Sequence, residues 1–272
     1  MTTTTFLSRY ILCLDSSALC NEARQPTINS GCVAIHAAAA HTFQVMSKTL
    51  ATSIQRAQKT LRLTEIYKSI QGESTWAGKP CTFIRLARCH LRCVWCDTSY
   101  AFYGGEKVSI GEILSKCSEM DCTLVEITGG EPLVQPECID LAAALLDVGY
   151  TVLVETSGTL PIRDLPAETI KIMDLKCPDS GECDKNDWSN IDALSAQDEV
   201  KFVIASRGDY EWSREIVRTY ALPDRCNAVL FSPVFGAVEP VQLVQWILDD
   251  GLDVRFQLQL HKLIWPPDQK GV

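Results

Sequence analysis

The sequence predicts an α/β fold in which parallel strands and helices alternate, as they do in a β/α barrel. From about residue 61 onward, short apolar segments of strand length alternate with longer segments of helical period. That order is typical of parallel strands joined by right-handed crossovers. Polar or glycine-rich clusters follow five of these strands directly, and a β/α barrel places its active site at the carboxyl ends of its strands.

Each expected element follows from its local pattern. Residues 63–70 alternate like a half-buried strand, and the later strands are short apolar runs. Ser109 and Glu112 have the spacing of a capping box, which predicts a helix from there to about Met120. The further expected strands cover residues 82–87, 124–128, 151–155, 170–175, 200–205, 228–231 and 254–260. The further expected helices cover residues 136–148, 209–220 and 238–250.

The composition narrows the class of protein. A chain of 272 residues is long enough for one large α/β domain. The net charge of −9, without a basic stripe, argues against binding to nucleic acid. The chain contains thirteen cysteines, an odd number, and some of them are clustered. It has no convincing signal peptide. Together these features fit a reducing compartment and a metal site. No apolar run reaches membrane-spanning length, so we expect a soluble, cytoplasmic protein with no membrane partner.

Residues 1–60 differ in composition from the rest. They contain a threonine run, an alanine run and few acidic residues, and they show no clear period. We expect a poorly structured N-terminal extension over residues 1–60, followed by a core domain over residues 61–272. A transit-like segment, or sequence upstream of a start at Met46, are the competing interpretations.

Three cysteines in one short loop are the most informative feature. Cys89, Cys93 and Cys96 are separated by three and then two residues. A structural zinc site or a four-thiolate cluster needs a fourth protein ligand, but the next cysteine along the chain is Cys117. Three thiolates can hold three irons of a 4Fe–4S cluster and leave the fourth iron open to a small molecule. Buried structural cysteines are the weaker interpretation, because such thiols do not need this clustering.

Several polar or flexible residues near the strand ends allow two interpretations. Gly129 and Gly130 let the backbone approach a ligand closely, or they form an ordinary strand-to-helix turn. Asp97 with Thr98 can bind a hard cation through oxygen ligands, or Asp97 braces the loop.

Three further positions are also open to two interpretations. Arg85 lies in an apolar strand, where an unpaired cation is costly, so it either forms an ion pair or faces an anionic ligand. Glu155 and Ser157 would suit ribose hydroxyls, with helix capping by the serine as the alternative. His261 ends the last expected strand, where a structural role competes with ligand binding.

The cysteine spacing resembles that of the radical S-adenosylmethionine (SAM) superfamily, whose motif is Cys-x-x-x-Cys-x-x-Cys with an aromatic residue before the last cysteine. Trp95 fills the aromatic position. The resemblance implies that SAM chelates the open iron through its amino and carboxylate groups. One electron then splits the sulfonium and releases a 5′-deoxyadenosyl radical, while the protein positions the reacting atoms.

An ordered set of motifs from about residue 63 to the C-terminus resembles 7-carboxy-7-deazaguanine synthase. The motifs are Glu65-Ile66-Tyr67-Lys68-Ser69-Ile70-Gln71-Gly72-Glu73, Phe83-Ile84-Arg85-Leu86, Cys93-Val94-Trp95-Cys96-Asp97-Thr98, Ile127-Thr128-Gly129-Gly130-Glu131-Pro132-Leu133, Glu155-Thr156-Ser157-Gly158, Asp174-Leu175-Lys176-Cys177-Pro178 and Gln257-Leu258-Gln259-Leu260-His261-Lys262. The resemblance says nothing about residues 1–60.

The family resemblance implies a carbon–nitrogen lyase. It would convert 6-carboxy-5,6,7,8-tetrahydropterin to 7-carboxy-7-deazaguanine with loss of ammonia, a step toward queuosine and related 7-deazapurines. The implied cofactors are a 4Fe–4S cluster, SAM that is reused, and Mg²⁺, with an electron donor such as flavodoxin. The implied fold is an incomplete, open relative of the TIM-like β/α barrel, paired as a homodimer.

The resemblance also assigns site residues by position. The metal ligands are Cys89, Cys93 and Cys96 for the cluster and Thr98 for magnesium. The SAM contacts are Gly130, Ser157, Asp174, Leu175, Lys176, Ser232, Pro233 and Val234. The substrate contacts are Ile70, Gln71, Gly72, Arg85, Thr128 and His261, with the arginine pairing with the substrate carboxylate. No side chain is assigned as catalytic, because the radical comes from SAM.

Two features depart from the family pattern. The chain continues beyond His261-Lys262 to Val272, whereas some members end shortly after that element and use the terminal residue at the substrate. An Asp-Leu-Lys element stands where other members have Ser-Pro-Lys, so only Lys176 carries over directly there.

Two other functions fit the cysteine loop. A glycyl-radical activating enzyme shares the spacing and the SAM chemistry, but it needs a groove for a partner polypeptide and leaves Gln71, Arg85 and His261 unexplained. A non-catalytic iron–sulfur module would hold its cluster without any response to SAM.

Overall fold

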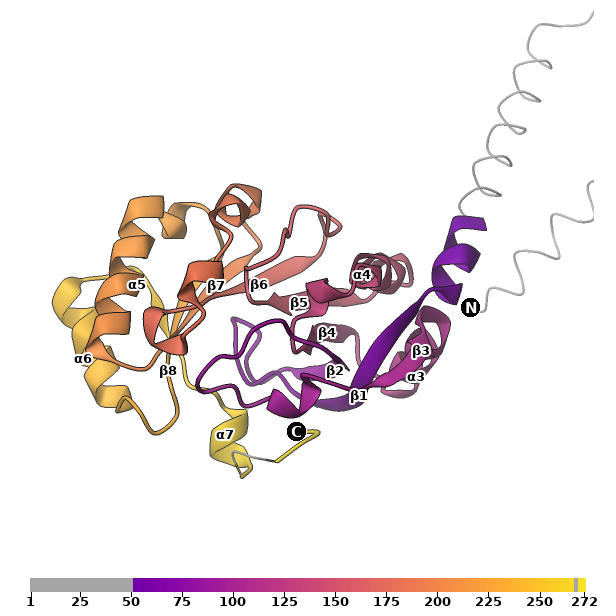
Figure 1. Ribbon diagram of the computed structural model, residues 1–272, viewed down its shortest axis with the longest axis horizontal. Coiled ribbons are helices and arrows are strands. Elements are labelled where there is room, and N and C mark those ends of the chain that lie inside the picture. Colours follow the sequence, from indigo (N-terminus) through magenta and orange to yellow (C-terminus); the bar gives the residue numbers. More distant parts are fainter. Residues whose placement is uncertain (1–50, 267–268) are drawn as a thin grey trace, which may run out of the picture. The chain divides into compact units, whose positions relative to one another are not determined.

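The computed structural model describes residues 51–266 and 269–272, which form one mixed α/β unit (Figure 1). The strands are β1 (Thr60–Ile70), β2 (Pro80–Leu86), β3 (Glu106–Ser109), β4 (Leu124–Gly129), β5 (Thr151–Thr156), β6 (Ile170–Leu175), β7 (Glu199–Ile204), β8 (Ala228–Pro233) and β9 (Arg255–Phe256). The helices are α3 (Ile110–Glu119), α4 (Glu137–Asp147), α5 (Arg207–Tyr220), α6 (Pro240–Asp250) and α7 (His261–Ile264). A further helix covers residues 51–58. Within these described ranges, none of the helices has the length and apolar character needed to cross a membrane.

The strands form one sheet in the order β3-β1-β2-β4-β5-β6-β7-β8-β9. From β2 to β9, neighbouring strands run parallel, which confirms the predicted arrangement for this part. The expectation is wrong for β1, which runs antiparallel to β2 and to the unexpected strand β3. The loop over residues 71–79 joins β1 to β2 without a crossover helix, and only antiparallel strands can be joined by such a short connection.

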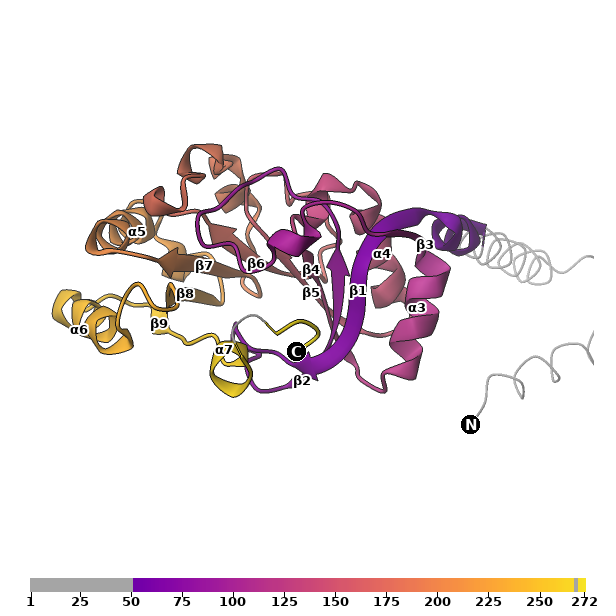
Figure 2. The ribbon, with the colours of Figure 1, turned by 60° about the horizontal axis from the view of Figure 1, so that its bottom comes forward.

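The sheet stays open. Across the described part of the chain, β3 and β9 are its two edges and no ladder joins them. Figure 2 shows that the sheet is curved and that α3, α4, α5 and α6 lie along its convex side, whereas α7 lies near the C-terminus. The predicted fold class, an incomplete and open β/α barrel, is therefore confirmed.

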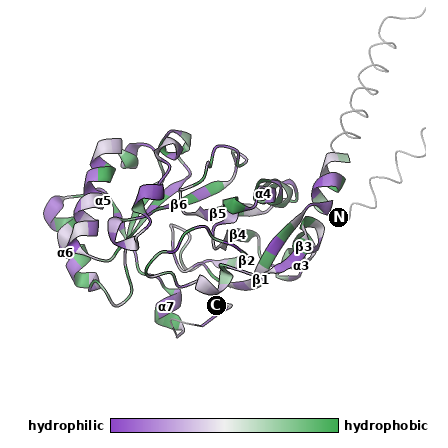
Figure 3. Cartoon of the chain, in the orientation of Figure 1, coloured by the Kyte–Doolittle hydropathy of each residue, from purple (hydrophilic) through white to green (hydrophobic). Residues whose placement is uncertain are grey.

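Two hydrophobic clusters use the two faces of the sheet. On the helix-covered face, Val125 and Ile127 of β4 belong to the large core that also contains Leu141 and Leu145 of α4. On the inner face a smaller cluster fills the lower part of the barrel: Cys81, Phe83, Leu124, Leu153 and Ile172. Successive strand residues point to opposite faces, and this alternation is visible along β1 in Figure 3.

The expected helices form close to their predicted bounds. Helix α3 begins at the predicted capping box: Ser109 Oγ accepts a hydrogen bond from the Glu112 N–H, and the glutamate carboxylate accepts one from the Ser109 N–H at 2.8 Å. The alternation of helices with strands is incomplete, however. The connections from β5 to β6 and from β6 to β7 contain only loops and short 3-10 helices.

The last expected strand, residues 254–260, is wrong in its extent. Only Arg255–Phe256 pair with β8. After Gln257, whose N–H donates to the Phe231 carbonyl, the chain leaves the sheet, and the Leu260 N–H donates to the Gly72 carbonyl at 3.0 Å. The segment therefore joins the loop after β1 instead of extending β9.

The predicted N-terminal extension lies mostly outside the described residues, as do the possible start at Met46 and the transit-like interpretation. The described end of that segment, residues 51–58, is helical. Ion pairs tie this region to α4: Arg56 contacts Asp147, and Lys59 Nζ lies 2.6 Å from Asp140 Oδ2. The domain boundary at residue 60 stays a prediction.

We predict that Asp198→Ala lowers the free energy of unfolding. Asp198 is fully buried, accepts the Lys171 N–H at 2.8 Å, and lies 3.1 Å from the Lys171 ammonium. Removal of its carboxylate leaves a buried cation unpaired, which costs about 3 kcal/mol. Urea unfolding followed by circular dichroism measures the change.

The control for that experiment is Glu211→Ala, which breaks the exposed pair between Arg207 and Glu211 in α5. Exposed pairs contribute little, so the expected change is below about 0.5 kcal/mol. Equal destabilisation by the two substitutions would contradict the account of Asp198.

Candidate active site

One cavity of about 600 Å³ lies at the carboxyl ends of the parallel strands, where the sequence places the active site. The predicted site residues that line it are Ile70, Gln71, Gly72, Arg85, Cys89, Cys93, Cys96, Thr98, Thr128, Gly130, Ser157, Asp174, Lys176, Val234 and His261. Leu175, Ser232 and Pro233 are not in the wall but are buried behind it. The fold thus gathers residues from both ends of the core domain around one space.

The cysteine loop is held by backbone contacts on both sides. Arg88, at the start of the loop, has a positive φ of 80° and its N–H donates to the Ala101 carbonyl at 2.7 Å. The Arg92 N–H donates to the buried Glu182 carboxylate, and the Val94 N–H donates to the Ser180 carbonyl at 3.1 Å. Thus the loop's conformation is fixed by its neighbours and does not depend on the thiols alone.

The thiols of Cys89, Cys93 and Cys96 are the candidate ligands of the cluster. All three line the cavity and are partly exposed. Among the described residues, no group of three or more His, Cys, Asp or Glu side chains could hold one metal ion. The Leu91 N–H donates to Cys89 Sγ at 3.4 Å, a contact of the kind that tunes iron–sulfur clusters. Burial raises the pKa of the Cys93 thiol to about 11, although Lys176 counteracts this; a bound metal would favour the thiolate.

Gly129 and Gly130 let the end of β4 press against the cysteine loop. Gly129 has a φ of 144°, and a Cβ there would lie 2.1 Å from the Leu86 carbonyl oxygen. A Cβ on Gly130 would lie 2.3 Å from the Arg88 carbonyl oxygen and 2.7 Å from the Cys89 Cβ. No side chain fits at either position, so the two glycines set the distance between the predicted SAM-binding strand end and the predicted cluster ligands.

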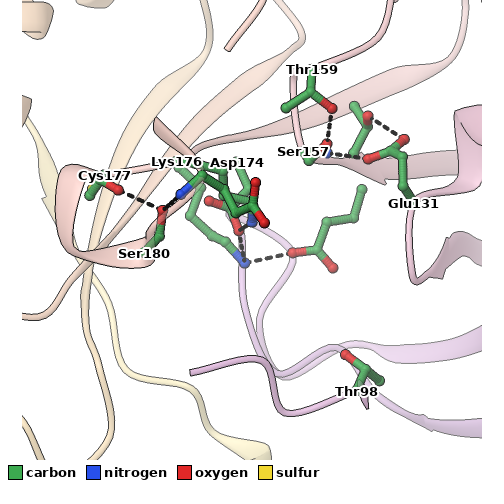
Figure 4. Close-up of polar contacts among 12 residues, drawn as sticks. Thr98, Glu131, Ser157, Thr159, Asp174, Lys176, Cys177 and Ser180 are labelled. Carbon is green, nitrogen blue, oxygen red and sulfur yellow. Dashed lines mark hydrogen bonds and ion pairs between the residues drawn. The ribbon is translucent and has the colours of Figure 1, made fainter. Parts of the chain in front are cut away.

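Figure 4 shows three residues predicted to contact SAM, Ser157, Asp174 and Lys176, with their polar contacts. The buried Glu131 carboxylate accepts hydrogen bonds from the Thr156 hydroxyl at 2.7 Å and the Ser157 N–H at 2.6 Å. Lys176 Nζ lies 2.8 Å from Asp174 Oδ2. The Ser232 hydroxyl is enclosed and has no hydrogen-bond partner among the described residues. Glu131 therefore fixes the end of β5, while the lysine and aspartate neutralise each other at the end of β6.

Arg85 forms the ion pair that one of the two interpretations predicted, and the anionic ligand of the other stays a prediction. Its Nε lies 2.8 Å from Glu65 Oε1, and its Nη2 donates to the Tyr67 hydroxyl at 2.8 Å. Nη1 has no hydrogen-bond partner among the described residues and is not one of their enclosed, unpaired polar atoms. Arg85 is thus ion-paired, and one edge of its guanidinium is left for an anion in the cavity.

The buried Lys201, which gathers three carboxylates in the cavity wall, is missing from the site residues assigned from the sequence. Lys201 of β7, only 3% exposed, lies 2.5 Å from Glu155 Oε1, 2.8 Å from Glu73 Oε2 and 3.9 Å from Asp174 Oδ2. Burial alone would lower the pKa of Lys201, but the three carboxylates raise it well above its usual value. The sequence did contain a sign of this cluster, because Lys201 lies inside an apolar strand. A cation in that position is stable only when it is paired with an anion.

Glu155 belongs to this charged cluster through its ion pair with Lys201. Its second oxygen, Oε2, accepts a hydrogen bond from the Thr128 hydroxyl at 3.2 Å. Both carboxylate oxygens therefore have protein partners. The interpretation of Glu155 as a partner of ribose hydroxyls stays a prediction.

Of the two residues considered as ligands of a hard cation, Asp97 is occupied by protein partners and Thr98 is more available. Lys262 Nζ lies 2.7 Å from Asp97 Oδ2, and the Thr98 hydroxyl donates to Asp97 Oδ1 at 3.0 Å. Burial would raise the pKa of Asp97, but Lys262 and Thr98 lower it to about 2. The lysine therefore neutralises Asp97, and the oxygen of Thr98 is left as the candidate ligand in the cavity wall.

His261 and the C-terminal residues complete the wall. His261 packs on Gly72, where a Cβ would lie 2.5 Å from the histidine Nδ1. Burial lowers the pKa of His261 despite the nearby Glu73 carboxylate, which favours the neutral ring. Residues 269–272 also line the cavity, and Lys270 Nζ lies 4.2 Å from the centre of the Tyr100 ring. The tail that departs from the family pattern thus reaches the site.

Comparison with known proteins defines the class. The model of the radical SAM superfamily matches residues 83–221, from β2 through the cysteine loop to the end of α5. The open barrel and the three-cysteine loop at its carboxyl rim agree with this match. The chain is a radical SAM protein.

Two relatives define the family. A protein from Koribacter versatilis is 46% identical over 226 residues, which cover 78% of this chain and 100% of the relative. One from Chlorobaculum tepidum is 44% identical over 215 residues, which cover 78% of this chain and 97% of the relative. Both are named 7-carboxy-7-deazaguanine synthase, and this chain belongs to the 7-carboxy-7-deazaguanine synthase family.

A solved structure agrees with the fold. The crystal structure of QueE from Escherichia coli superposes with a TM-score of 0.65 at 22% identity, covering 77% of this chain and 98% of that one. The resemblance made from the sequence motifs is therefore confirmed, and the two alternative functions are not favoured.

We predict that Gly130→Ala impairs cluster assembly. The added Cβ must displace the Arg88 carbonyl or Cys89, and displacement of groups that position metal ligands typically lowers metal affinity by about 10-fold or more. Iron and sulfide per chain after anaerobic reconstitution measure the effect. Gly208→Ala, a position in α5 where the new Cβ meets only ordinary contacts, is the control, and equal iron content in the two variants would refute the prediction.

Proposed function

We propose that the chain converts 6-carboxy-5,6,7,8-tetrahydropterin to 7-carboxy-7-deazaguanine with loss of ammonia, as a carbon–nitrogen lyase in queuosine or 7-deazapurine biosynthesis. The observation that carries this proposal is the shared cavity, whose wall contains both the three cysteines and the free edge of Arg85. A carboxylated, fused-ring substrate needs a cationic partner for its acid group near the site where the radical is made. Family membership supports the same reaction.

The cofactor sites follow from the residues in the cavity wall. A 4Fe–4S cluster with bound SAM would supply one electron and a 5′-deoxyadenosyl radical that removes a hydrogen atom from the substrate. The residues proposed to hold the cluster are Cys89, Cys93 and Cys96. The residues proposed to contact SAM are Gly130, Ser157, Asp174, Lys176 and Val234, with Leu175, Ser232 and Pro233 supporting them from behind the wall.

The remaining substrate and metal contacts extend this proposal. Ile70 at the end of β1, Gln71 and Gly72 in the loop that follows, and Thr128 near the end of β4 would surround the ring. His261 would contact it as a neutral imidazole. Thr98 would give magnesium its single protein ligand, with substrate and water completing the oxygen shell that this ion prefers.

The family resemblance implies the dimer and the electron donor, whereas the location and the domain boundary come from the composition of the sequence. We propose a homodimer, a flavodoxin-like electron donor and a cytoplasmic location. We also propose that residues 61–272 are the catalytic domain and that the preceding segment is dispensable.

The direct test is an anaerobic assay of the reconstituted full chain with the carboxylated tetrahydropterin, SAM, Mg²⁺ and a reductant. We expect 7-carboxy-7-deazaguanine and ammonia in equal amounts. Cys93→Ala should abolish turnover and lower iron content, because two remaining thiolates cannot hold the cluster. An inactive wild-type chain with a full cluster, or retained turnover in the variant, would contradict the proposal.

We predict that Arg85→Ala weakens substrate binding specifically. Loss of a charge-assisted pair with the substrate carboxylate should raise KM by about 100-fold. Reductive SAM cleavage without substrate should continue at the wild-type rate, because Arg85 pairs with Glu65 and Tyr67 and does not contact the cysteine loop. Arg85→Lys, which keeps the charge but not the bidentate geometry, should be intermediate. An unchanged KM in the alanine variant would show that the carboxylate binds elsewhere.

A further inference from the structure

Glu126 is a buried acid in the cavity wall to which neither the proposed reaction nor the family resemblance assigns a role. It lies in β4, two residues before Thr128, and points to the inner face between Leu124 and Thr128. It is 3% exposed and lines the cavity. Its neighbours in register are Phe83 on β2 and Leu153 on β5. A carboxyl group therefore lies directly above the apolar floor of the barrel.

One oxygen of this carboxyl group has no hydrogen-bond partner within residues 51–266 and 269–272. Glu126 Oε2 accepts a hydrogen bond from Gln71 Nε2. The Gln71 amide is held in place because its Oε1 accepts the Glu73 N–H at 3.1 Å. Glu126 Oε1 has no hydrogen bond to any described residue, and it is not one of their enclosed, unpaired polar atoms. Since the side chain lines the cavity, a ligand can reach Oε1, and Oε2 keeps a second lone pair beside the hydrogen bond from Gln71.

The charges that face Glu126 favour its protonated form. Burial raises the pKa of this carboxyl well above its usual value, and Glu155 on β5 and Glu73 in the loop after β1 raise it further, while Lys201 on β7 opposes them. Lys201 lies within 4 Å of Glu155, Glu73 and Asp174 but forms no ion pair with Glu126. The charge of Lys201 is therefore shared among the other three acids, and Glu126 has no cationic partner there. A buried carboxyl group without a cationic partner stays neutral.

We propose that Glu126, as a neutral carboxylic acid, recognises the lactam edge of the fused-ring substrate, with Oε1–H donating to the ring carbonyl and Oε2 accepting the adjacent ring N–H. This inference rests on the proposed function, because the pterin ring of that substrate carries such a lactam. A neutral acid offers one donor and one acceptor, which complements a lactam. An ionised carboxylate offers two acceptors and would instead complement two neighbouring N–H groups.

The surroundings suit a flat heterocycle placed against this acid. Phe83 and Tyr67 stack with ring centroids 5.2 Å apart, and both line the cavity together with Ile172. These side chains provide apolar faces, whereas Glu126 and Gln71 provide the in-plane polar edge. Arg85, two residues beyond Phe83 on β2, faces the same cavity, so the acid end and the lactam edge of one substrate can be bound together.

The test measures substrate affinity in the reconstituted full chain with SAM present and reductant absent, so that no turnover occurs. Glu126→Leu removes both polar groups and leaves the lactam unpaired, and it should weaken binding by about 100-fold. Glu126→Gln keeps one donor and one acceptor and should weaken binding by less than about 5-fold. Unchanged affinity in the leucine variant, or equal losses in both variants, would overturn the proposal.

A second measurement does not depend on how much of each variant is folded. The 3-methyl analogue of the substrate replaces the ring N–H with an N-methyl group, which removes the donor that Oε2 would accept. The wild-type chain should bind the analogue about 10-fold more weakly than the lactam substrate, and Glu126→Leu should bind the two alike. Equal binding of the two ligands by the wild-type chain would overturn the proposal.

Glu199→Gln is the matched control. Glu199 is also a buried acid whose pKa burial raises, but it binds Thr75 and does not line the cavity. Its substitution should leave affinity unchanged, and an equal loss there would overturn the specific role of Glu126. Turnover of the pterin by the wild-type chain is scored separately, so failure of the proposed function is distinguished from failure of this inference.

Discussion

The buried ammonium of Lys201 is the interaction on which the site depends. A lone cation at 3% exposure would cost several kcal/mol, so the fold must bring carboxylates to it. They come from three separate places: Glu73 from the loop after β1, Glu155 from β5 and Asp174 from β6. Lys201 therefore joins the antiparallel start of the sheet to its parallel centre. Gln259, which donates to the Glu73 carboxylate at 2.8 Å, extends the same network to the C-terminal segment.

Close backbone packing is the second constraint, and it acts on the other side of the cavity. Gly129 and Gly130 bring the end of β4 against Leu86, Arg88 and Cys89, at distances that exclude any side chain. The charged network shapes the proposed substrate side, and the glycine contact shapes the proposed cofactor side. Both sides open into one cavity. A radical made at the cysteine loop would therefore reach the substrate without crossing bulk solvent.

The sequence predicted the parts of the fold whose signals are local. The capping box at Ser109, the apolar strand before Gly129 and the cysteine spacing each depend on residues close together in the chain. Strand direction has no such signal, since a period of two is the same for parallel and antiparallel strands. The extent of β1 was therefore predicted correctly, but its direction relative to its neighbours was not. Residues 257–260 alternate like a strand. In the structure, however, the side chains of Gln257 and Gln259 donate hydrogen bonds to the Glu73 carboxylate, and the backbone leaves the sheet.

Most of the candidate site was predicted by its motifs, but the pairing of its charges was not. Lys201 and Glu73 are 128 positions apart, and Gln71 and Glu126 are 55 apart, so only the folded chain shows that they meet. Arg85 illustrates the difference. Its burial in an apolar strand indicated a partner, and the structure supplied one in Glu65 while leaving an edge free for another.

The central claim is that the three-cysteine loop holds a cluster whose open position faces the substrate cavity. Electron paramagnetic resonance of the anaerobically reconstituted, reduced chain tests this most directly, because direct coordination of SAM perturbs the signal of the cluster. We predict a clear change of the spectrum when SAM is added. A cluster signal that is identical with and without saturating SAM would contradict the account.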